Sequence, residues 1–171
     1  MEFDRSLRVP LEYIPALTDS DHFVLRAVYS HVQAVSQVTA DKHAVDSYAE
    51  SSDDPSRSLE ALFGRRDIKA IITALPGVPP DPVIIRALKA GKHVLSDQPM
   101  AIDVAKAKTM LKWYKANCDE EILWSVGQHI RYEEPVLFAV RQLKDLGGIV
   151  KTFTLKKHIK SAEGDQPSTH G

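Results

Sequence analysis

The sequence has little cysteine, no excess charge of either sign and no long apolar run. Cys118 is its only cysteine, so no internal disulfide can form, which favours a reducing, cytoplasmic compartment. The 22 Lys and Arg residues nearly balance 23 Asp and Glu residues, and the net charge of −1 would not attract nucleic acid or an anionic membrane. No apolar run approaches the roughly 20 residues that span a bilayer, and residues 1–10 lack the apolar stretch of a secretory signal. These absences argue against secreted, membrane and nucleic-acid-binding proteins.

Several catalytic signatures are missing as well. The seven histidines show neither an HxH nor an HxxxH spacing and no Cys–His cluster, so the sequence predicts no metal site. No G-x-S-x-G nucleophile elbow occurs. Cys118 is followed by Asp119 and Glu120, two acids that raise the pKa of a thiol, so we expect an inert cysteine. Neither a G-x-G-x-x-G turn nor a Walker loop is present to hold a phosphate group.

Strand-like and helix-like segments alternate along most of the chain. Apolar, β-rich runs predict strands at residues 23–30, 69–75, 93–96, 122–126 and 149–155. The run at 69–75 is almost continuously apolar, which is typical of a strand covered on both faces. The run at 149–155 alternates polar and apolar residues, as a strand with one face in water does.

Helices are predicted between these strands. Apolar residues at helical spacing predict helices at 81–89 and 134–144, and Gly147 and Gly148 mark the end of the second one. Asp103 is the predicted N-cap of a third helix. The apolar residues expected to face the core from this third helix are Val104, Ala107, Leu111 and Tyr114.

The alternation predicts an α/β fold of the Rossmann type, with a mostly parallel sheet and helices on both faces. We expect residues 1–148 to form this degenerate dinucleotide-binding domain. Residues 149–171 are predicted to be the start of a truncated second domain, one strand followed by a loose polar tail.

Polar segments follow three of the predicted strands, at residues 30–31, 96–99 and 127–132. They lie at the carboxyl ends of these strands, where open α/β sheets bind their ligands. The candidate catalytic residues are Asp97, Gln98, His129 and Arg131; the candidate substrate-binding residues are Gln128 and Tyr132. His129 is the best candidate for proton transfer because histidine ionises near neutral pH. Arg131 would orient an anionic or carbonyl oxygen. On composition alone, an ordinary loop is the favoured explanation of the segments at 96–99 and 127–132, and a helix N-cap explains Ser30 equally well.

Four segments in succession resemble one family. FVLRAVYS, DIKAIITALP, IIRALKAGKHVLSDQP and ILWSVGQHIRYEEP are similar to segments of the Gfo/Idh/MocA family of NAD(P)-dependent oxidoreductases, in particular its fungal members. The stretch ALKAGKHVLSDQP resembles the family signature AL-x-AGKHV-x-x-EKP, and the resemblance runs from about residue 10 to about residue 158. It implies a Rossmann domain, a second α/β domain, and hydride transfer between a nicotinamide and a sugar- or polyol-like substrate. It also implies that Ser30 and His31 meet the adenosine half of the cofactor, with Leu75 and Pro76 under the dinucleotide.

The chain departs from the family pattern at its chemical centre. Gln98 stands where the signature has lysine, and Asp97 stands where it has glutamate. Glutamine is neither an acid nor a base near pH 7, and it carries no positive charge. The second domain, with its usual catalytic histidine and aspartate, has no counterpart that the sequence identifies.

The first strand of the family and its glycine-rich loop also have no counterpart ahead of PLEYIPAL. That strand is central in a doubly wound sheet, so its loss leaves the runs at 23–30 and 69–75 without their shared neighbour. We expect these two runs either to pair directly or to accept another strand, for which 149–155 is the best candidate. A homo-oligomer through the sheet edge or through strand 149–155 is therefore predicted.

Three functions remain open. In the first, which the sequence favours, the scaffold has lost hydride transfer and needs no cofactor. It then catalyses a redox-neutral isomerisation, cyclisation or proton transfer on a small molecule, in fungal metabolism. In the second, the chain is a short form or fragment of a genuine NAD(P)-dependent oxidoreductase. In the third, it is a non-catalytic regulatory or scaffolding pseudoenzyme. The first is favoured because polar residues persist at the strand ends while the phosphate loop and the lysine are absent.

Overall fold

The structure is a computed structural model that describes residues 13–74 and 81–147. The chain divides into two compact units, one of residues 4–127 and one that includes residues 128–171. All described strands belong to the larger unit, and α6 (Glu134–Leu146) belongs to the smaller one. No helix within the described ranges is long and apolar enough to cross a membrane.

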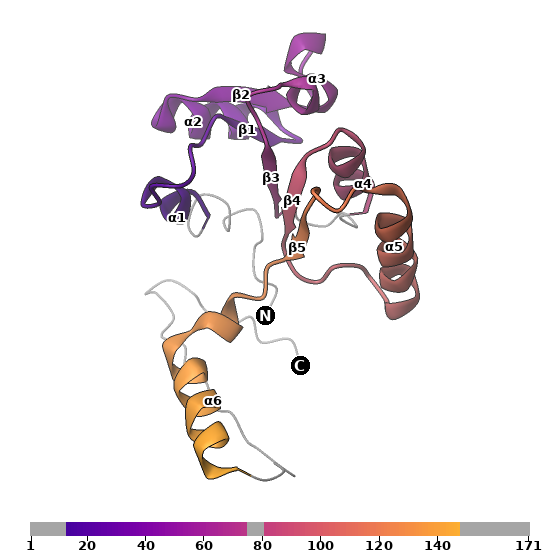
Figure 1. Ribbon diagram of the computed structural model, residues 1–171. Helices are drawn as coiled ribbons and strands as arrows, with labels where there is room; N and C mark the ends of the chain where they lie inside the picture. The colour runs from indigo at the N-terminus through magenta and orange to yellow at the C-terminus, as the bar shows by residue number, and fades with distance from the viewer. Residues whose placement is uncertain (1–12, 75–80, 148–171) are drawn as a thin grey trace, which may run out of the picture. The chain divides into compact units, whose positions relative to one another are not determined.

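The larger unit opens with a helix and a two-stranded parallel sheet (Figure 1). Its elements are α1 (Ile14–Thr18), β1 (Ala27–Ser30), α2 (Gln33–His43) and β2 (Asp46–Ala49). β1 pairs with β2 in parallel, from Ala27 opposite Asp46 to Ser30 opposite Ala49. The helix α2 is the crossover that a parallel pair requires.

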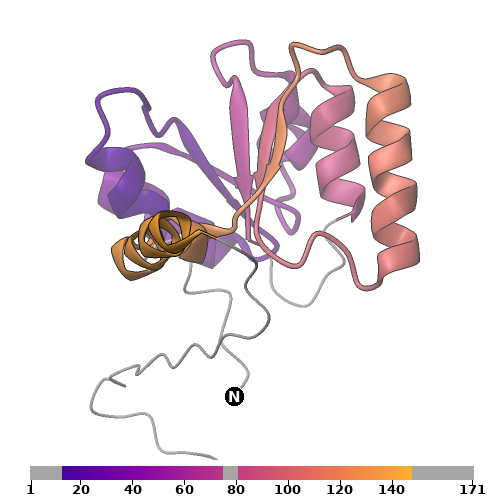
Figure 2. The same cartoon turned by 60° about the horizontal axis from the view of Figure 1, so that its bottom comes forward.

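A three-stranded parallel sheet follows, with strand order β3-β4-β5 (Figure 2). Its elements, with the helices around them, are η3 (Pro55–Arg57), α3 (Leu59–Gly64), β3 (Ala70–Thr73), α4 (Asp81–Lys89), β4 (His93–Ser96), α5 (Val104–Asn117) and β5 (Trp124–Val126). The predicted α/β, Rossmann-like fold is confirmed.

Helices cover both faces of the two-stranded sheet. Consecutive residues of a strand point to opposite faces. The Ser47 hydroxyl donates a hydrogen bond of 2.9 Å to the Ser36 hydroxyl on α2, whereas the next residue, Tyr48, is buried with Leu62 and Phe63 of α3. The crossover helix α2 and the helix α3 therefore lie on opposite sides of β2.

One apolar core joins the two sheets. Buried residues of α3, α4, β2, β4 and α5 form a single cluster that includes Tyr48, Phe63, Ile84, Val94 and Met110. Arg86 of α4 also pairs with Glu60 of α3 and lies over the Phe63 ring. The amphipathic helix α4 faces this core because its apolar residues recur at helical spacing, as the sequence predicts.

The sheets are not joined by hydrogen bonds between β1 and β3. Alternate residues of each strand bond to its one partner, so the backbone groups of Ala27, Tyr29, Ala70 and Ile72 point the other way. No strand of the part of the chain that the structure describes pairs with them. The expectation that the two runs pair directly is therefore wrong, and the alternative partner, 149–155, lies outside the described residues.

The interruption leaves β3 less covered than its composition predicts. Ala70 is exposed, and Ile71 and Ile72 are only half-buried, although this run is almost entirely apolar. The prediction of a strand covered on both faces is wrong within the described residues. The reason is that only one face, that of Ile71, packs against the core cluster.

A polar connection crosses from β2 to the start of β4. The Lys92 side chain is buried, and its ammonium donates hydrogen bonds to the carbonyl oxygens of Arg65 at 2.6 Å and Ile68 at 2.8 Å. The Arg65 guanidinium donates in turn to Asp46 at 2.5 Å and to the Tyr48 hydroxyl at 3.2 Å, both on β2. These bonds hold the segment between α3 and β3 against both sheets.

Three predicted strands are present with shorter bounds, and the predictions at 81–89 and 93–96 coincide with α4 and β4. The strand predicted at 23–30 begins at Ala27, because its pairing with β2 begins there, and Phe23 and Val24 are exposed. The prediction missed α1, α2, β2 and α3, of which α1 and α3 are only 5 and 6 residues long. Strand 149–155 lies outside the described residues, and the predicted domain boundary at 148 stays a prediction.

The prediction of which α5 residues face the core is partly wrong. Asp103 caps the helix as expected, accepting a hydrogen bond of 2.7 Å from the Lys106 amide. Ala107 and Tyr114 pack against the core, but Val104 and Leu111 are exposed. The Tyr114 hydroxyl donates a 2.5 Å bond to Ile122 O, which helps to fix which stripe of α5 faces inward.

The smaller unit contains η4 (His129–Tyr132) and α6, which ends at Gly147 as predicted. Gly147 has a φ of 66°, a conformation that glycine adopts at little cost. Phe138, Val140, Leu143 and Leu146 of α6 are exposed in this structure.

The buried Lys92 ammonium gives a test of this architecture. Lys92→Met keeps the alkyl chain but leaves the Arg65 and Ile68 carbonyls without their donor. We expect it to lower the free energy of unfolding by about 2–3 kcal/mol, measured by urea denaturation. The matched control is Lys108→Met on the exposed side of α5, which should change stability by less than about 0.5 kcal/mol. Equal effects of the two substitutions would contradict a bridging role for Lys92.

Candidate functional site

The carboxyl end of β4 carries the first predicted site segment. Asp97 is buried, at 7% exposure, and its amide donates to Thr73 O on β3 at 2.8 Å. Its carboxylate oxygen Oδ1 accepts hydrogen bonds from the Gln98 amide at 2.9 Å and from the Tyr13 hydroxyl at 3.4 Å. Asp97 therefore helps to fix the turn after β4, and its catalytic role stays a prediction.

Gln98 is the half-exposed residue of this segment. Its side-chain amide makes no hydrogen bond within residues 13–74 and 81–147, and the peptide bond between Gln98 and Pro99 is cis. The amide can donate to or accept from a ligand at the sheet edge, but it cannot transfer a proton.

The adjacent strand end is closely packed. Gly127 follows β5, and its amide donates a 2.7 Å bond to Ser96 O. A Cβ at Gly127 would lie 3.1 Å from the Tyr13 hydroxyl and 3.5 Å from Ser96 O, so the position favours glycine. Tyr13, just before α1, thereby reaches the ends of both β4 and β5.

The second predicted segment lies in the smaller unit. Gln128 precedes η4, and His129, Arg131 and Tyr132 lie within it. All four side chains are exposed, and the Arg131 guanidinium lies over the Tyr132 ring at 5.8 Å. Asp97 and Gln98 belong to the other compact unit, so the prediction that the two segments form one site stays a prediction.

The carboxyl ends of β1 and β2 form a second cluster. Ser30 ends β1, and its hydroxyl oxygen accepts a 3.3 Å bond from the Val32 amide. His31 Nδ1 lies 2.5 Å from Oε2 of Glu50, which follows β2, and the Tyr29 hydroxyl donates to the same oxygen at 3.3 Å. The rings of Tyr29 and His31 meet edge to face, with centroids 5.9 Å apart.

The pKa values of this cluster follow from these contacts. The hydrogen bond and the charge of His31 lower the pKa of Glu50, so its carboxylate is ionised at neutral pH. Burial, followed by the Glu50 carboxylate, raises the pKa of Tyr29 to about 12. Burial, followed by Asp119, raises the pKa of Cys118, in agreement with the predicted inert thiol.

Sequence reasoning missed Glu50, Tyr29 and Tyr13. Glu50 follows β2, a strand that the sequence did not predict, so its place beside the end of β1 had no signal. The other predicted cofactor contacts, Leu75 and Pro76, lie outside the described residues. Among the residues described, no group of three or more His, Cys, Asp or Glu could hold a metal ion.

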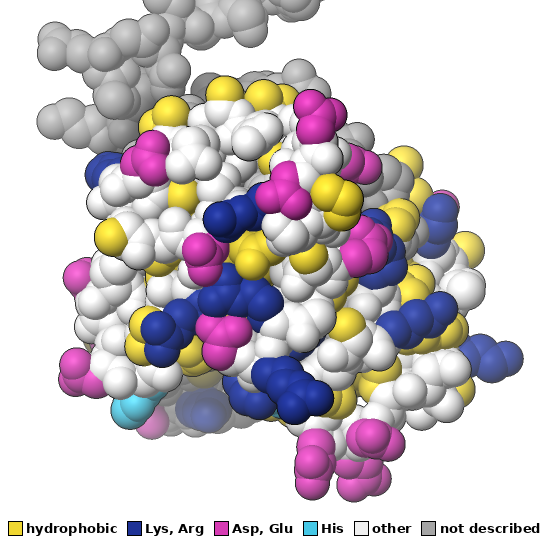
Figure 3. All heavy atoms as spheres, turned by 90° about the horizontal axis from the view of Figure 1, so that it is seen from above, with side chains coloured by type: hydrophobic (Ala, Val, Ile, Leu, Met, Phe, Trp, Pro, Cys, Tyr) yellow, Lys and Arg dark blue, Asp and Glu magenta, His cyan; other side chains and the backbone are white. Residues whose placement is uncertain are grey.

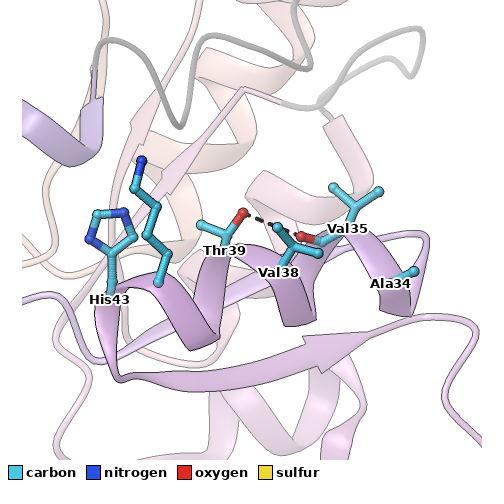
Figure 4. A pocket seen from close by; sticks show the side chains of 6 residues that line it. Ala34, Val35, Val38, Thr39 and His43 are labelled. Carbon is cyan, nitrogen blue, oxygen red and sulfur yellow. Dashed lines mark hydrogen bonds between the residues drawn. The ribbon is translucent and has the colours of Figure 1, made fainter.

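A hollow of about 540 Å³ lies against α2 (Figure 4). Three apolar and three polar side chains line it, Ala34, Val35, Val38, Thr39, Lys42 and His43. It contains none of the predicted site residues. The face drawn in Figure 3 carries basic and acidic side chains intermingled, as the ion pairs of Arg65 with Asp46 and Asp67 lead one to expect.

Sequence comparisons agree with the resemblance. The family model for oxidoreductases with an NAD-binding Rossmann fold, Gfo/Idh/MocA, matches residues 9–119. Dehydrogenase FPY6 of Fusarium mangiferae is 35% identical over 147 residues, which cover 84% of this chain and 42% of the dehydrogenase. A dTDP-3,4-didehydro-2,6-dideoxy-alpha-D-glucose 3-reductase of Streptomyces violaceoruber is 30% identical over 80% of this chain and 36% of its own length. The chain thus spans about two fifths of these relatives.

Solved structures share the fold. KijD10, a 3-ketoreductase from Actinomadura kijaniata in complex with NADP and TDP-benzene, superposes with a TM-score of 0.64 at 23% identity. The match covers 82% of this chain and 39% of that one. The scyllo-inositol dehydrogenase from Lactobacillus casei gives a TM-score of 0.61 at 23% identity, over 84% of this chain and 38% of its own.

The raised pKa of Tyr29 predicts a pH effect. The folded chain keeps the Tyr29 proton up to about pH 12, whereas an unfolded chain releases it near pH 10. The free energy of unfolding should therefore fall as pH rises from about 10 towards 12. Carbon-13 NMR of the tyrosine Cζ atoms measures the titration, and Tyr29→Phe identifies the signal. Glu50→Gln should lower the Tyr29 pKa, and titration of wild-type Tyr29 near pH 10 would contradict the assignment.

Proposed function

This chain belongs to the Gfo/Idh/MocA oxidoreductase family, and from that membership we propose that it is the nucleotide-binding part of an NAD(P)-dependent oxidoreductase. The reaction proposed is hydride transfer between the nicotinamide and a carbonyl or alcohol carbon of a sugar-like small molecule. The relatives named above, a dehydrogenase and a sugar 3-reductase, support the substrate class.

The observation that carries the proposal is the position of the polar residues. Ser30, His31 and Glu50 lie at the carboxyl ends of β1 and β2, and Asp97 and Gln98 lie at the carboxyl end of β4. Ligands of open parallel sheets bind at these ends. The family match covers all four of the strands β1 to β4.

The described residues fit the adenosine half of a dinucleotide. The ends of β1 and β2 offer the Ser30 hydroxyl and the ionised Glu50 carboxylate, which suit the hydroxyl groups of a ribose. For the pyrophosphate, the sequence contains no glycine-rich turn. When bound, the nicotinamide supplies the hydride; Gln98 would hydrogen-bond the substrate oxygen, and Asp97 would hold the turn on which Gln98 lies.

This proposal replaces the redox-neutral enzyme that the sequence favoured. The family match and the relatives support an oxidoreductase rather than an isomerase, a cyclase or a scaffold, and they favour NAD(P) rather than the absence of a cofactor. Gln98 remains a departure from the family signature. Its amide cannot supply a proton, whereas the lysine of the signature can.

Cofactor binding is the first test. Calorimetric titration of the 171-residue protein with NADH and with NADPH should give a dissociation constant in the micromolar range for at least one of them. Absence of binding of either dinucleotide at millimolar concentration would overturn the proposal.

Gln98 provides a second test, on catalysis. Gln98→Lys restores the residue of the signature, and a positioned proton donor contributes roughly 100- to 10,000-fold to such reactions. We expect at least a tenfold increase in the rate of NAD(P)H oxidation at 340 nm with a panel of keto sugars. Gln37→Lys, on the exposed side of α2, is the matched control and should leave the rate unchanged. No increase for Gln98→Lys would show that this side chain does not face the reacting oxygen.

A further inference from the structure

Tyr13 reaches two strand ends that lie far from it in the sequence. Its hydroxyl donates a 3.4 Å hydrogen bond to Oδ1 of Asp97, which follows β4. A Cβ at Gly127, which follows β5, would lie 3.1 Å from the same hydroxyl and 3.9 Å from Asp97 Oδ1. The Tyr13 hydroxyl therefore lies beside both strand ends, in space that a side chain at position 127 would need.

The Asp97 carboxylate connects this contact to Gln98. The oxygen that accepts from Tyr13, Oδ1, also accepts a 2.9 Å hydrogen bond from the Gln98 amide. The Asp97 amide donates to Thr73 O on β3 at 2.8 Å, so the backbone of Asp97 is held by the sheet. Rotation of its side chain remains to be restrained, and a second donor on Oδ1 restrains it.

The backbone that carries Tyr13 is held by packing. Ile14, the first residue of α1, follows Tyr13 directly and is only 1% exposed. A tyrosine side chain adds only two torsion angles, so an anchored backbone leaves its hydroxyl little freedom. Tyr13 is therefore suited to hold a partner in one orientation.

We propose that Tyr13 is a positioning residue for Gln98: its hydroxyl orients the Asp97 carboxylate, and that carboxylate holds the turn from which the Gln98 side chain reaches the substrate oxygen. Gly127 belongs to the same arrangement, because a side chain there would meet the Tyr13 hydroxyl. This inference rests on the proposed function, since it assumes that Gln98 contacts the substrate.

The first measurement needs neither cofactor nor turnover. Proton–nitrogen NMR of the full chain follows the Gln98 backbone amide in Tyr13→Phe, which keeps the ring and removes the hydroxyl. We expect this amide to exchange with solvent about three- to fivefold faster, because its carboxylate acceptor has lost one restraint. The matched control, Tyr114→Phe, removes a hydroxyl that donates a 2.5 Å bond to Ile122 O, and it should leave the Gln98 amide unchanged.

Gly127→Ala tests the same contact from the other strand end. Its methyl group would meet the Tyr13 hydroxyl at 3.1 Å, so the Gln98 amide should exchange faster in this variant too. The double variant Tyr13→Phe with Gly127→Ala removes the atom that the methyl group meets. Its effect, expressed as a free energy, should be clearly smaller than the sum of the two single effects, whereas unconnected residues give additive effects.

A kinetic measurement connects the contact with the proposed reaction. In the Gln98→Lys protein, adding Tyr13→Phe should lower kcat for NAD(P)H oxidation about three- to tenfold and change KM for the dinucleotide less than about twofold. The reason is that the side chain at position 98 is displaced while the cofactor still binds. An equal loss of kcat on adding Tyr114→Phe would contradict a specific role for Tyr13.

The outcomes separate this inference from the proposed function. An unchanged Gln98 amide in folded Tyr13→Phe protein, or additive effects in the double variant, overturns the role of Tyr13 and leaves the oxidoreductase proposal standing. Absence of dinucleotide binding overturns the oxidoreductase proposal, and with it the role of Gln98 towards a substrate, even where the amide measurements confirm the contact.

Discussion

The hydrogen bonds of Lys92 and Arg65 connect β2 to the sheet of β3 and β4, and among the described residues no strand pairing makes that connection. Lys92, just before β4, donates to two carbonyls ahead of β3, and the Arg65 side chain donates to two residues of β2. Burial lowers the pKa of Lys92, and the two carbonyl oxygens that accept from its ammonium offset part of the cost of burying the charge. Together with the core around Phe63 and Ile84, these bonds keep five strands in one compact unit although the sheet is interrupted.

The hydrogen bonds of Lys92 and Arg65 bear on function because they fix the amino ends of β2 and β4 and leave the carboxyl ends of these strands available to a ligand. Lys92 directly precedes β4, and the Arg65 side chain bonds to Asp46 at the start of β2. Glu50 and Gln98 lie beyond the opposite, carboxyl ends of β2 and β4. Near the amino ends, Lys92 and Arg65 make structural hydrogen bonds. Near the carboxyl ends, Oε1 of Glu50 and the Gln98 side-chain amide make no hydrogen bond within the described ranges. The molecule thus separates stabilising polar groups from groups that can contact a ligand.

The sequence predicted the fold class and most of the second sheet because those segments carry strong signals. Residues 81–89 and 93–96 coincide with α4 and β4, since continuous apolar runs and helical spacing are dictated by burial. β2 escaped prediction because Asp46 and Ser47 break the apolar pattern, and their bonds to Arg65 and Ser36 are visible only in three dimensions. Because β2 was not predicted, Glu50, the residue that follows it, was not identified as a candidate either. Gln98 and His31 were found from their places after strands, but the availability of their polar atoms depends on neighbours far away in the sequence.

The interruption between β1 and β3 also affects how the described strands come together. Each sheet is built from consecutive strands joined by a single crossover, so every described strand pair joins adjacent stretches of the chain. Loop closure over such distances costs little entropy, and folds rich in local contacts fold quickly. Among the described strands, each sheet can therefore complete its own pairing before the two sheets dock through their shared core.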